Sequence, residues 1–419
     1  MTTKRNIFLW LLYDFANSMV SIVFFLYFSQ WIVIERGIPD IWFNLTFTVS
    51  ALLLLLTVPI FGFLLGKFFR RITGIRYTTV FTAILYSACA ISAIFEKDTT
   101  ALVFFTLGLY AYLLSFTFYT PLINDISLPG KRGRISGFGI AANYLGQLVG
   151  LFLVLPLANG GFSFFGSSAR AETLLPAVVI FFILSLPTLI FFKELKQEKP
   201  VFHFMPEFKE LFRKTKELFL YPGVALFILA YFLFNDAILT AANNFSIFLE
   251  RVWGAPDTTK TYIMLGILIT SAIGGLVSGI VADRFGHKKT LLFILAGWVF
   301  ILPLVGFIKD FTFFVSVASV MGFWFGANWA VSRSVMSYLA PERGHNLAFA
   351  YFGLAERASS IIGPIVWGLV LSGLAGTGMG SDRYRFAMLA VTVFIVLGLI
   401  VLTRVRSDRA GQRGLKKDL

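Results

Sequence analysis

The chain has 419 residues, of which 57% are hydrophobic and 14% are charged, and its formal net charge is +14. A soluble protein spends roughly a quarter of its residues on Asp, Glu, Lys and Arg. A water-soluble globular fold is therefore excluded, because its core could not hide this much apolar surface, and lipid must cover much of it.

The basic residues stand in short clusters between apolar runs, which argues against a nucleic-acid-binding domain. Cys89 is the single cysteine, so a disulfide framework and a multi-thiolate metal site are ruled out. We predict no cofactor and no bound metal. The apolar stretch after Met1 to Arg5 is too long for the core of a signal peptide, and we interpret it as a retained first span.

A transmembrane helix needs about 20 mostly apolar residues, and segments of this kind recur along the whole chain. We place twelve spans at residues 7–35, 42–66, 77–95, 100–124, 135–157, 173–192, 219–248, 261–282, 290–308, 311–337, 346–372 and 386–403.

The loops between these spans differ in positive charge according to the side on which they lie. Loops on one side carry 26 Lys and Arg residues, and loops on the other side carry 8. Cytoplasmic loops accumulate Lys and Arg. We therefore expect a multi-pass integral membrane protein with both termini in the cytoplasm, in the plasma membrane rather than an organelle membrane.

The longest basic loop divides the chain into similar halves. We predict an N-terminal six-helix bundle over 1–192, a cytoplasmic linker over 193–218, a C-terminal six-helix bundle over 219–404 and a basic tail over 405–419. The segment Leu128–Arg134 resembles Leu339–His345 at an offset of 211 residues. Two similar halves of this kind are typical of a rocking-bundle transporter. The expected fold class is all-α, with two pseudo-symmetric six-helix bundles.

The segment from Gly279 to Lys289 resembles the loop motif of the major facilitator superfamily, G-x-x-x-D-R-x-G-R-[KR]-[KR], with His287 in place of the first Arg after the glycine. In that superfamily the motif's aspartate caps and pairs with neighbouring helices and stabilises one conformation. A tight turn that serves topology alone is the alternative. The first-half copy is degraded, with Gly66 and Lys67 where Asp and Arg stand in the motif. The resemblance implies a conformational gate of Gly279, Asp283, Arg284, Gly286 and Lys288.

Within the superfamily the chain resembles the autophagy-related vacuolar effluxer-like branch. Four segments carry this resemblance: Tyr13–Ser18, Leu128–Gly146, Tyr231–Asp236 and Glu342–Gly363. Fungal members of the branch are associated with the release of amino acids from vacuoles. The resemblance therefore implies the major facilitator fold over the whole chain and amino-acid export as the activity.

Charged side chains inside a bilayer cost several kcal/mol unless they are paired or hydrated, so each is a functional candidate. Arg333 and Glu356 can form a structural ion pair, which would leave Arg357 to meet an anionic group of a substrate. Asp14 lies about 10 Å along its helix from the cytoplasmic start, where a gate or packing role is the alternative. The five intramembrane charges are Asp14, Asp236, Arg333, Glu356 and Arg357.

Polar side chains share helical faces with these charges, because residues three, four and seven apart return to a similar angle. Asp236 is the deeper of the two carboxylates, and a desolvated carboxylate can bind and release a proton near neutral pH. The neighbouring polar candidates for substrate binding or coupling are Asn17, Asn143, Gln147, Asn235 and Asn244.

We therefore predict a secondary transporter that moves a small polar solute by alternating access, with amino acids as the implied solute and proton coupling left open. Its partners would be the solute, protons where coupling exists, and membrane lipids, and a monomer would suffice. We predict no enzymatic activity, because all three histidines fall in loops and no Cys/His cluster is present. A lipid-handling or sensor protein on the same fold stays an alternative.

Overall fold

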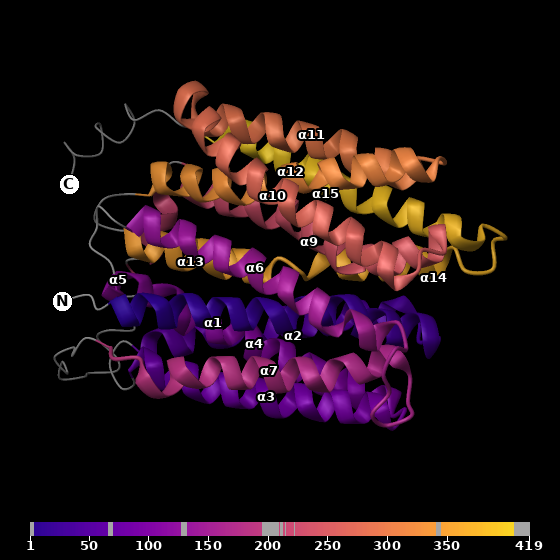
Figure 1. Cartoon of the computed structure of the whole chain (residues 1–419). Helices are drawn as coiled ribbons and strands as arrows, with labels where there is room; N and C mark the ends of the chain where they lie inside the picture. Colours follow the sequence, from indigo (N-terminus) through magenta and orange to yellow (C-terminus); the bar gives the residue numbers. More distant parts are fainter. Residues whose placement is uncertain are drawn as a thin grey trace, which may run out of the picture. The chain divides into compact units, whose positions relative to one another are not determined.

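The computed structural model describes residues 4–65, 70–126, 132–194, 209, 213, 215–221, 223–340 and 345–405. Every regular element in these ranges is a helix, as Figure 1 shows. Twelve helical spans in the described residues are long and apolar enough to cross a membrane, and each overlaps one predicted span, with ends that differ by up to eight residues. The predicted all-α membrane fold with twelve transmembrane helices is confirmed.

The first six spans are formed by helices α1 to α7. Two of the shorter elements, η3 (Thr120–Leu122) and α5 (Ile123–Ile126), follow α4. The long helices are α1 (Lys4–Val23), α2 (Asp40–Leu65), α3 (Arg71–Ile94), α4 (Asp98–Tyr119), α6 (Arg132–Ala158) and α7 (Ala169–Phe191).

The last six spans are formed by helices α9 to α15. Span eleven consists of two helices instead of the single one predicted over 346–372, because α13 ends at Ala358 and α14 begins at Ile362. The helices are α9 (Val224–Trp253), α10 (Asp257–Phe285), α11 (His287–Phe307), α12 (Phe311–Leu339), α13 (His345–Ala358), α14 (Ile362–Gly373) and α15 (Arg383–Arg404).

The chain forms two compact units, which we call unit 1 and unit 2. Unit 1 contains Met1–Val201 and Asn243–Leu265, and unit 2 contains Phe202–Ala242 and Gly266–Leu419. This grouping differs from the predicted bundles in two places: the hairpin at the junction of α9 and α10 belongs to unit 1, and the units divide between residues 201 and 202, inside the predicted linker. The predicted boundaries at 192 and 219 stay a prediction.

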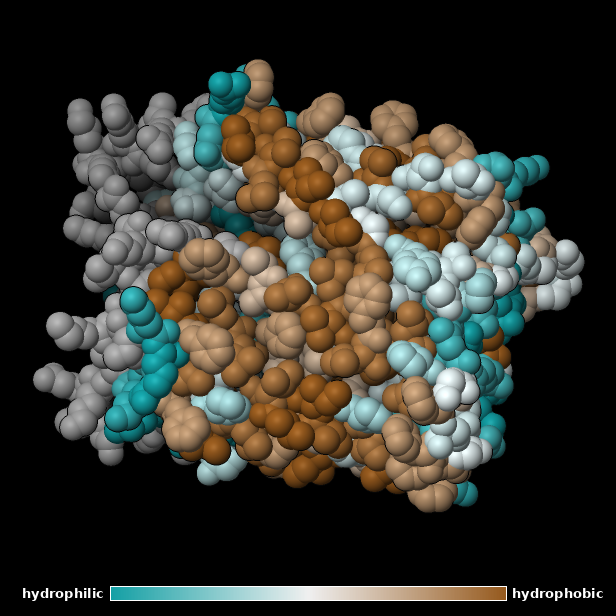
Figure 2. Space-filling model, viewed as in Figure 1, coloured by the Kyte–Doolittle hydropathy of each residue, from teal (hydrophilic) through white to brown (hydrophobic). Residues whose placement is uncertain are grey.

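The outer surfaces of the helices are apolar. Leu276, Phe293 and Phe300 are each more than two-thirds exposed, and Figure 2 shows hydrophobic residues over much of the visible helix surface, with hydrophilic residues toward the helix ends. In water such a surface would drive aggregation, whereas in a bilayer it contacts acyl chains.

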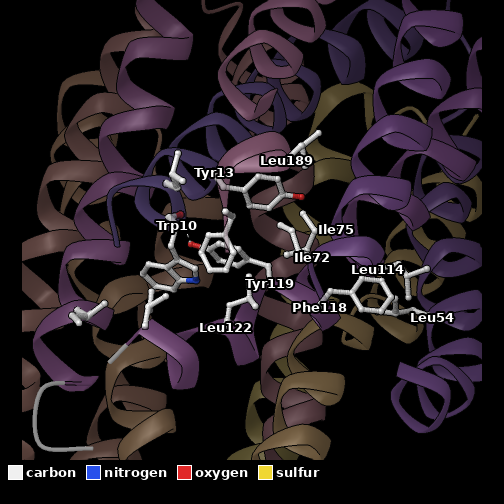
Figure 3. Packing of buried hydrophobic residues seen from close by; sticks show 14 residues of the cluster. Trp10, Tyr13, Leu54, Ile72, Ile75, Leu114, Phe118, Tyr119, Leu122 and Leu189 are labelled. Atoms are coloured by element: carbon white, nitrogen blue, oxygen red, sulfur yellow. Dashed lines mark hydrogen bonds between the residues drawn. The ribbon is translucent and has the colours of Figure 1, made fainter. Parts of the chain in front are cut away.

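The core of unit 1 is rich in aromatic side chains. The rings of Trp10 and Tyr119 stack with their centroids 5.0 Å apart, and the Tyr119 hydroxyl donates a hydrogen bond of 2.9 Å to the Trp10 carbonyl oxygen. The Tyr13 hydroxyl lies 2.7 Å from the Thr79 hydroxyl. Figure 3 shows Trp10, Tyr13 and Tyr119 packed together. This cluster fixes the end of α1 that precedes Asp14.

Glycines let neighbouring helices approach closely. A Cβ atom on Gly146 of α6 would lie 2.3 Å from the carbonyl oxygen of Phe15 in α1, and one on Gly150 would lie 2.7 Å from that of Met19. In unit 2, a Cβ atom on Gly326 of α12 would lie 1.8 Å from the carbonyl oxygen of Ser271 in α10. Small residues at such crossings are common in membrane helices, because they allow backbone contact.

Span one changes from α-helix to π-helix along its length. Beyond α1, residues Phe24–Phe28 and Trp31–Glu35 form two π-helical segments, η1 and η2. Helical periodicity in the sequence predicts a span but does not distinguish these segments. Short π-helices are rare and frequently lie at functional sites.

Several sequence predictions fall outside the described residues. They concern the degraded motif at Gly66 and Lys67, the middle of the linker, most of the repeated loop segments Leu128–Arg134 and Leu339–His345, and the tail after residue 405.

We predict that Gly146→Ala destabilises the protein by about 1–3 kcal/mol, because the added methyl group meets backbone that cannot rotate away. Thermal unfolding in detergent measures the change. Gly373→Ala is the matched control, since a Cβ atom there meets nothing within 4 Å. Equal melting temperatures for the two variants would contradict the packing assigned to Gly146.

Candidate functional site

Unit 1 contains a chain of three polar side chains between α1 and α6. Asn143 donates from Nδ2 to Oδ1 of Asp14 at 3.3 Å, and Gln147 donates from Nε2 to Oδ1 of Asn143 at 2.8 Å. All three side chains are half-buried. The close approach of the helices at Gly146 places Asn143 within reach of Asp14. The structure therefore brings together three of the predicted site residues.

Asn17 is buried on α1 but is not part of this chain of contacts. Its amide donates from Nδ2 to the carbonyl oxygen of Tyr13 at 2.8 Å, so this hydrogen bond stays within the helix. Such local bonds satisfy a polar group in an apolar surrounding without a second helix. Asn17 stays a predicted site residue.

In unit 2, Asp236 of α9 caps the second half of the broken span eleven. Its Oδ1 accepts from the backbone N–H of Ile361 at 3.2 Å, and its Oδ2 accepts from Ile362 at 3.0 Å and Gly363 at 2.8 Å. The first N–H groups of a helix have no partner within it, and a carboxylate is well suited to them. Asp236 thereby provides hydrogen-bond acceptors for the backbone N–H groups at the start of α14.

Asn235 holds the other side of the same break. Its Nδ2 donates to the Ser359 hydroxyl at 2.8 Å and to the Glu356 carbonyl oxygen at 3.4 Å, at the end of α13. Gly363 is required beside Asp236, because a Cβ atom there would lie 2.3 Å from the Thr240 hydroxyl. Two adjacent residues of α9 therefore contact both ends of the break.

Arg333 of α12 and Glu356 of α13 form an ion pair with an N–O distance of 3.0 Å. The Arg333 side chain is 41% exposed, whereas that of Glu356 is 19% exposed. Arg357 is half-buried next to Glu356. The predicted pairing of Arg333 with Glu356 is present.

Two polar residues of α12 are buried on one face without hydrogen bonds. Both residues are fully buried. Within the described residues, the two amide atoms of Asn328 and the hydroxyl oxygen of Ser332 have no hydrogen-bond partner. The sequence shows them at an i, i+4 spacing next to Arg333, but they were not among the predicted site residues. Buried polar groups without partners mark positions for water or a ligand.

Asn244 belongs to unit 1 and does not join the Asp236 cluster. It forms a reciprocal amide pair with Asn44 of α2, with N–O distances of 3.0 and 2.8 Å. Both residues are fully buried. Asn44 was missed by the sequence reasoning, and a lone amide in the apolar span two is the signal that could have identified it.

The predicted gate motif forms the turn between α10 and α11. Asp283 and Arg284 are exposed at the end of α10, and Gly286 adopts a φ of 96°, which favours glycine. Lys288 donates from Nζ to the carbonyl oxygens of Thr403 at 2.9 Å and Val405 at 2.6 Å. A cation at the C-terminal end of α15 complements the helix dipole. The turn therefore ties α11 to α15.

Comparison with known protein families shows which family the chain belongs to. The profile of the family described as vacuole effluxer Atg22 like matches residues 124–414. The chain belongs to this Atg22-like family. That range contains the broken span eleven with both of its α9 contacts, the Arg333–Glu356 pair and the gate turn.

Individual relatives agree with this assignment. The MFS-type transporter YxiO of Bacillus subtilis (strain 168) is 23% identical over 95% of this chain and 94% of its own length. Autophagy-related protein 22 of Pichia angusta is 28% identical over 39% of this chain and 31% of its own length, so the Atg22-like chain spans about a third of that relative.

Solved structures show the same fold. A bacterial homologue of the human lysosomal transporter Spinster, in an inward-facing and unoccupied conformation, matches with a TM-score of 0.74 and 14% identity over 98% of this chain and 99% of its own. The nucleoside transporter NupG matches with a TM-score of 0.71 and 12% identity over 96% and 98%. The Atg22-like chain thus has the fold of these MFS transporters, as the resemblance in sequence implied.

We predict that Asp236→Asn weakens the start of α14. The amide nitrogen of the Asn side chain would lie opposite a backbone N–H group that donates to a carboxylate oxygen in the parent protein. The loss of a buried charge-assisted hydrogen bond costs about 1–3 kcal/mol. Hydrogen exchange of the backbone amides of Ile361, Ile362 and Gly363 should become faster. Glu217→Gln, at an exposed carboxylate of unit 2, is the control. Unchanged exchange in Asp236→Asn would contradict the capping role.

Proposed function

We propose that the Atg22-like chain is a secondary transporter that moves amino acids by alternating access. The observation that carries this proposal is the presence of charged and amide clusters inside otherwise apolar spans of each unit. Spans one and five hold Asp14 with Asn143, and spans seven and eleven hold the Asp236 cap beside Glu356. The first and fifth spans of each half of the sequence therefore carry these polar clusters.

The exposure of Arg333 supports a hydrated solute path. Its side chain is 41% exposed although α12 is a membrane span. A guanidinium in contact with acyl chains costs several kcal/mol, whereas one that faces water does not. The exposed part of Arg333 therefore fits a water-filled cavity better than the lipid surface.

Charged side chains of both signs lie within the membrane spans, and each sign suits one of the charged groups of an amino acid. Unit 1 offers the Asp14 carboxylate, which is complementary to an ammonium group. Unit 2 offers Arg333 and Arg357, and a guanidinium group binds a carboxylate with well-aligned hydrogen bonds. A zwitterionic solute carries both groups, which supports amino acids over a neutral solute.

Orientation and membrane are part of the same proposal. The excess of Lys and Arg on alternate loops supports cytoplasmic termini. The match to YxiO over nearly the full length of both chains supports the plasma membrane, since a bacterial cell has no vacuole. Asp283 and Arg284 would then act in a cytoplasmic gate.

Proteoliposome uptake tests the proposal directly. We expect counterflow of labelled amino acids, tested as a panel against a nucleoside and xylose as control solutes. Transport of a control solute without any amino acid would overturn the amino-acid assignment. Movement of fluorescent phospholipids between leaflets without any solute flux would favour the lipid-handling alternative.

Proton coupling is proposed to depend on the intramembrane carboxylates Asp14 and Asp236. The Asp236 carboxylate accepts hydrogen bonds from three backbone N–H groups, so its substitution affects the structure as well as the coupling. Asp14 is half-buried beside an amide and is the better site for a removable proton.

We predict that Asp14→Asn abolishes amino-acid accumulation driven by a pH gradient and spares counterflow, because the amide cannot carry a proton. Paired uptake assays with and without the gradient measure this. Asp382→Asn, at an exposed carboxylate, should retain both activities. If the Asp14→Asn variant still accumulates the amino acid under a pH gradient, another group carries the proton.

A second variant tests the recognition of the solute carboxylate. We predict that Arg357→Gln raises the KM for an amino acid by about tenfold or more, since a hydrogen bond to a charged group contributes about 1.5–3 kcal/mol. Inhibition by the corresponding amino-acid amide, which lacks the carboxylate, should not change. Arg404→Gln, at an exposed residue, serves as the control. Equal effects on the acid and its amide would contradict this role of Arg357.

A further inference from the structure

The loop between α6 and α7 carries three exposed phenylalanine side chains. Phe162, Phe164 and Phe165 are each more than half exposed. The loop joins spans five and six at the end of unit 1 opposite the N-terminus (Figure 1). Exposed rings in a short loop are unfavourable in water, because their apolar surface stays hydrated. A solvated connection between two helices therefore does not account for this loop.

The composition of the loop suits an apolar surrounding. Residues 159–168, which we call the Phe loop, read Asn-Gly-Gly-Phe-Ser-Phe-Phe-Gly-Ser-Ser and contain no Asp, Glu, Lys or Arg. A charged side chain resists transfer into a bilayer, so an uncharged loop can approach the acyl chains without that cost. The small polar residues between the rings are compatible with the head-group region.

A buried carboxylate organises the Phe loop from within. Glu172, in the first turn of α7, is 1% exposed. Its carboxylate accepts hydrogen bonds from the Ser163 hydroxyl at 2.8 Å and from the backbone N–H groups of Phe164 at 2.5 Å, Phe165 at 3.2 Å and Ser167 at 3.0 Å. The backbone that carries two of the three rings is thus held in one conformation by a single side chain.

The one remaining N–H group of this stretch has its partner inside the loop. The Gly166 N–H donates to the Ser163 hydroxyl oxygen at 3.0 Å. All four backbone N–H groups from Phe164 to Ser167 are therefore satisfied without water. A loop in water does not need such partners, because water supplies them, whereas a loop in contact with acyl chains does. This internal pairing points to lipid as the surrounding of the loop.

The lipid-facing surface of span five continues into the Phe loop. Phe152, Leu153 and Pro156 are exposed in the last two turns of α6, which ends at Ala158. In a membrane these side chains contact acyl chains, since they belong to a transmembrane span. The rings of the loop extend the same apolar surface beyond the end of the helix.

We propose that the Phe loop is an interfacial lipid anchor, which inserts its rings at the boundary between head groups and acyl chains of the leaflet opposite the N-terminus. Glu172 preorganises the loop for this contact. Apolar rings on an otherwise polar segment favour that boundary. The partner is the phospholipid bilayer, and a specific head group is not required, because the loop has no charge. The proposal is independent of the transport function.

Fluorescence quenching of a single label measures where the Phe loop lies. Phe164→Cys, in a Cys89→Ser background, is labelled with bimane and reconstituted into phosphatidylcholine nanodiscs. Two reference positions carry the same label. Ser381→Cys lies at an exposed residue of η6 (Gly380–Asp382), in the loop before α15, and Phe300→Cys lies at a residue of α11 that is 75% exposed.

We expect the label at position 164 to be shielded from water by lipid. Iodide is an ion and is strongly excluded from the bilayer. Its quenching constant should therefore be about tenfold or more lower at position 164 than at position 381. A phosphatidylcholine with a nitroxide near the head group should quench the label at 164 more than one with a nitroxide near the chain end. At position 300 the order should be reversed.

Two outcomes would overturn the lipid anchor. Equal iodide quenching at positions 164 and 381 would place the loop in water. Shielding from iodide without quenching by either nitroxide lipid would mean that protein covers the rings. Phe162→Cys is a second label position, which guards against a disturbance of the loop by the first label, and it should give the same profile as Phe164→Cys.

Glu172→Ala tests the organising role of the carboxylate. Its removal leaves three backbone N–H groups of the loop without an acceptor, so the loop should shift toward water, and iodide quenching at position 164 should rise toward the value at position 381. Glu194→Ala is the matched control. Glu194 accepts from the backbone N–H groups of Arg71 and Ile72 at 3.1 Å each, at the opposite end of unit 1.

The control variant should leave quenching at position 164 unchanged. Size-exclusion profiles of both variants show whether they are folded. An unchanged quenching profile in a folded Glu172→Ala variant would contradict the role of Glu172 in the anchor.

Discussion

A helix that stops inside a bilayer exposes backbone N–H and C=O groups that lipid cannot satisfy, and this constraint explains the organisation of unit 2. Span eleven is interrupted between Ala358 and Ile362, where water or protein must supply the missing partners. Asp236 supplies three of them, and Asn235 contacts the other end of the break. A charged residue in α9 is retained inside the membrane because the neighbouring span requires it.

The same reasoning separates structural from functional charge. Glu356 is committed to Arg333, and Asp236 to the backbone of α14, so each is already stabilised in the absence of a solute. Asn328 and Ser332 differ, since no hydrogen-bond partner of either was found in the described part of the chain. Groups that stay unsatisfied until a solute or water arrives are better placed to bind it than groups whose partners are permanent.

The sequence predicts the number, length and order of the spans because hydrocarbon thickness imposes a simple pattern of apolar length. It also identifies Asp14 and the pair of Arg333 with Glu356, because charges in apolar runs are conspicuous, whereas the contact of Asn143 with Asp14 follows only from the fold. The sequence does not predict features that depend on local backbone geometry. The break at Ser359 to Ile361 and the π-helices of span one leave no periodic signal in the sequence. The ion pairs of Lys260 with Glu250 and Asp257 were missed for another reason. Glu250, Asp257 and Lys260 stand at span ends, where charged residues are ordinary loop residues, and only the fold shows that Lys260 is buried.

The two kinds of contact in unit 1 have different mechanical consequences. The aromatic core around Trp10, Tyr13 and Tyr119 excludes water, so α1 and its neighbours are costly to separate. The hairpin between α9 and α10 is held by ion pairs and amide pairs, which water can satisfy, together with buried apolar side chains such as Ile247 and Phe248. A transporter of alternating access needs bundles that stay intact while it changes conformation, and the buried aromatic packing around α1 meets that need.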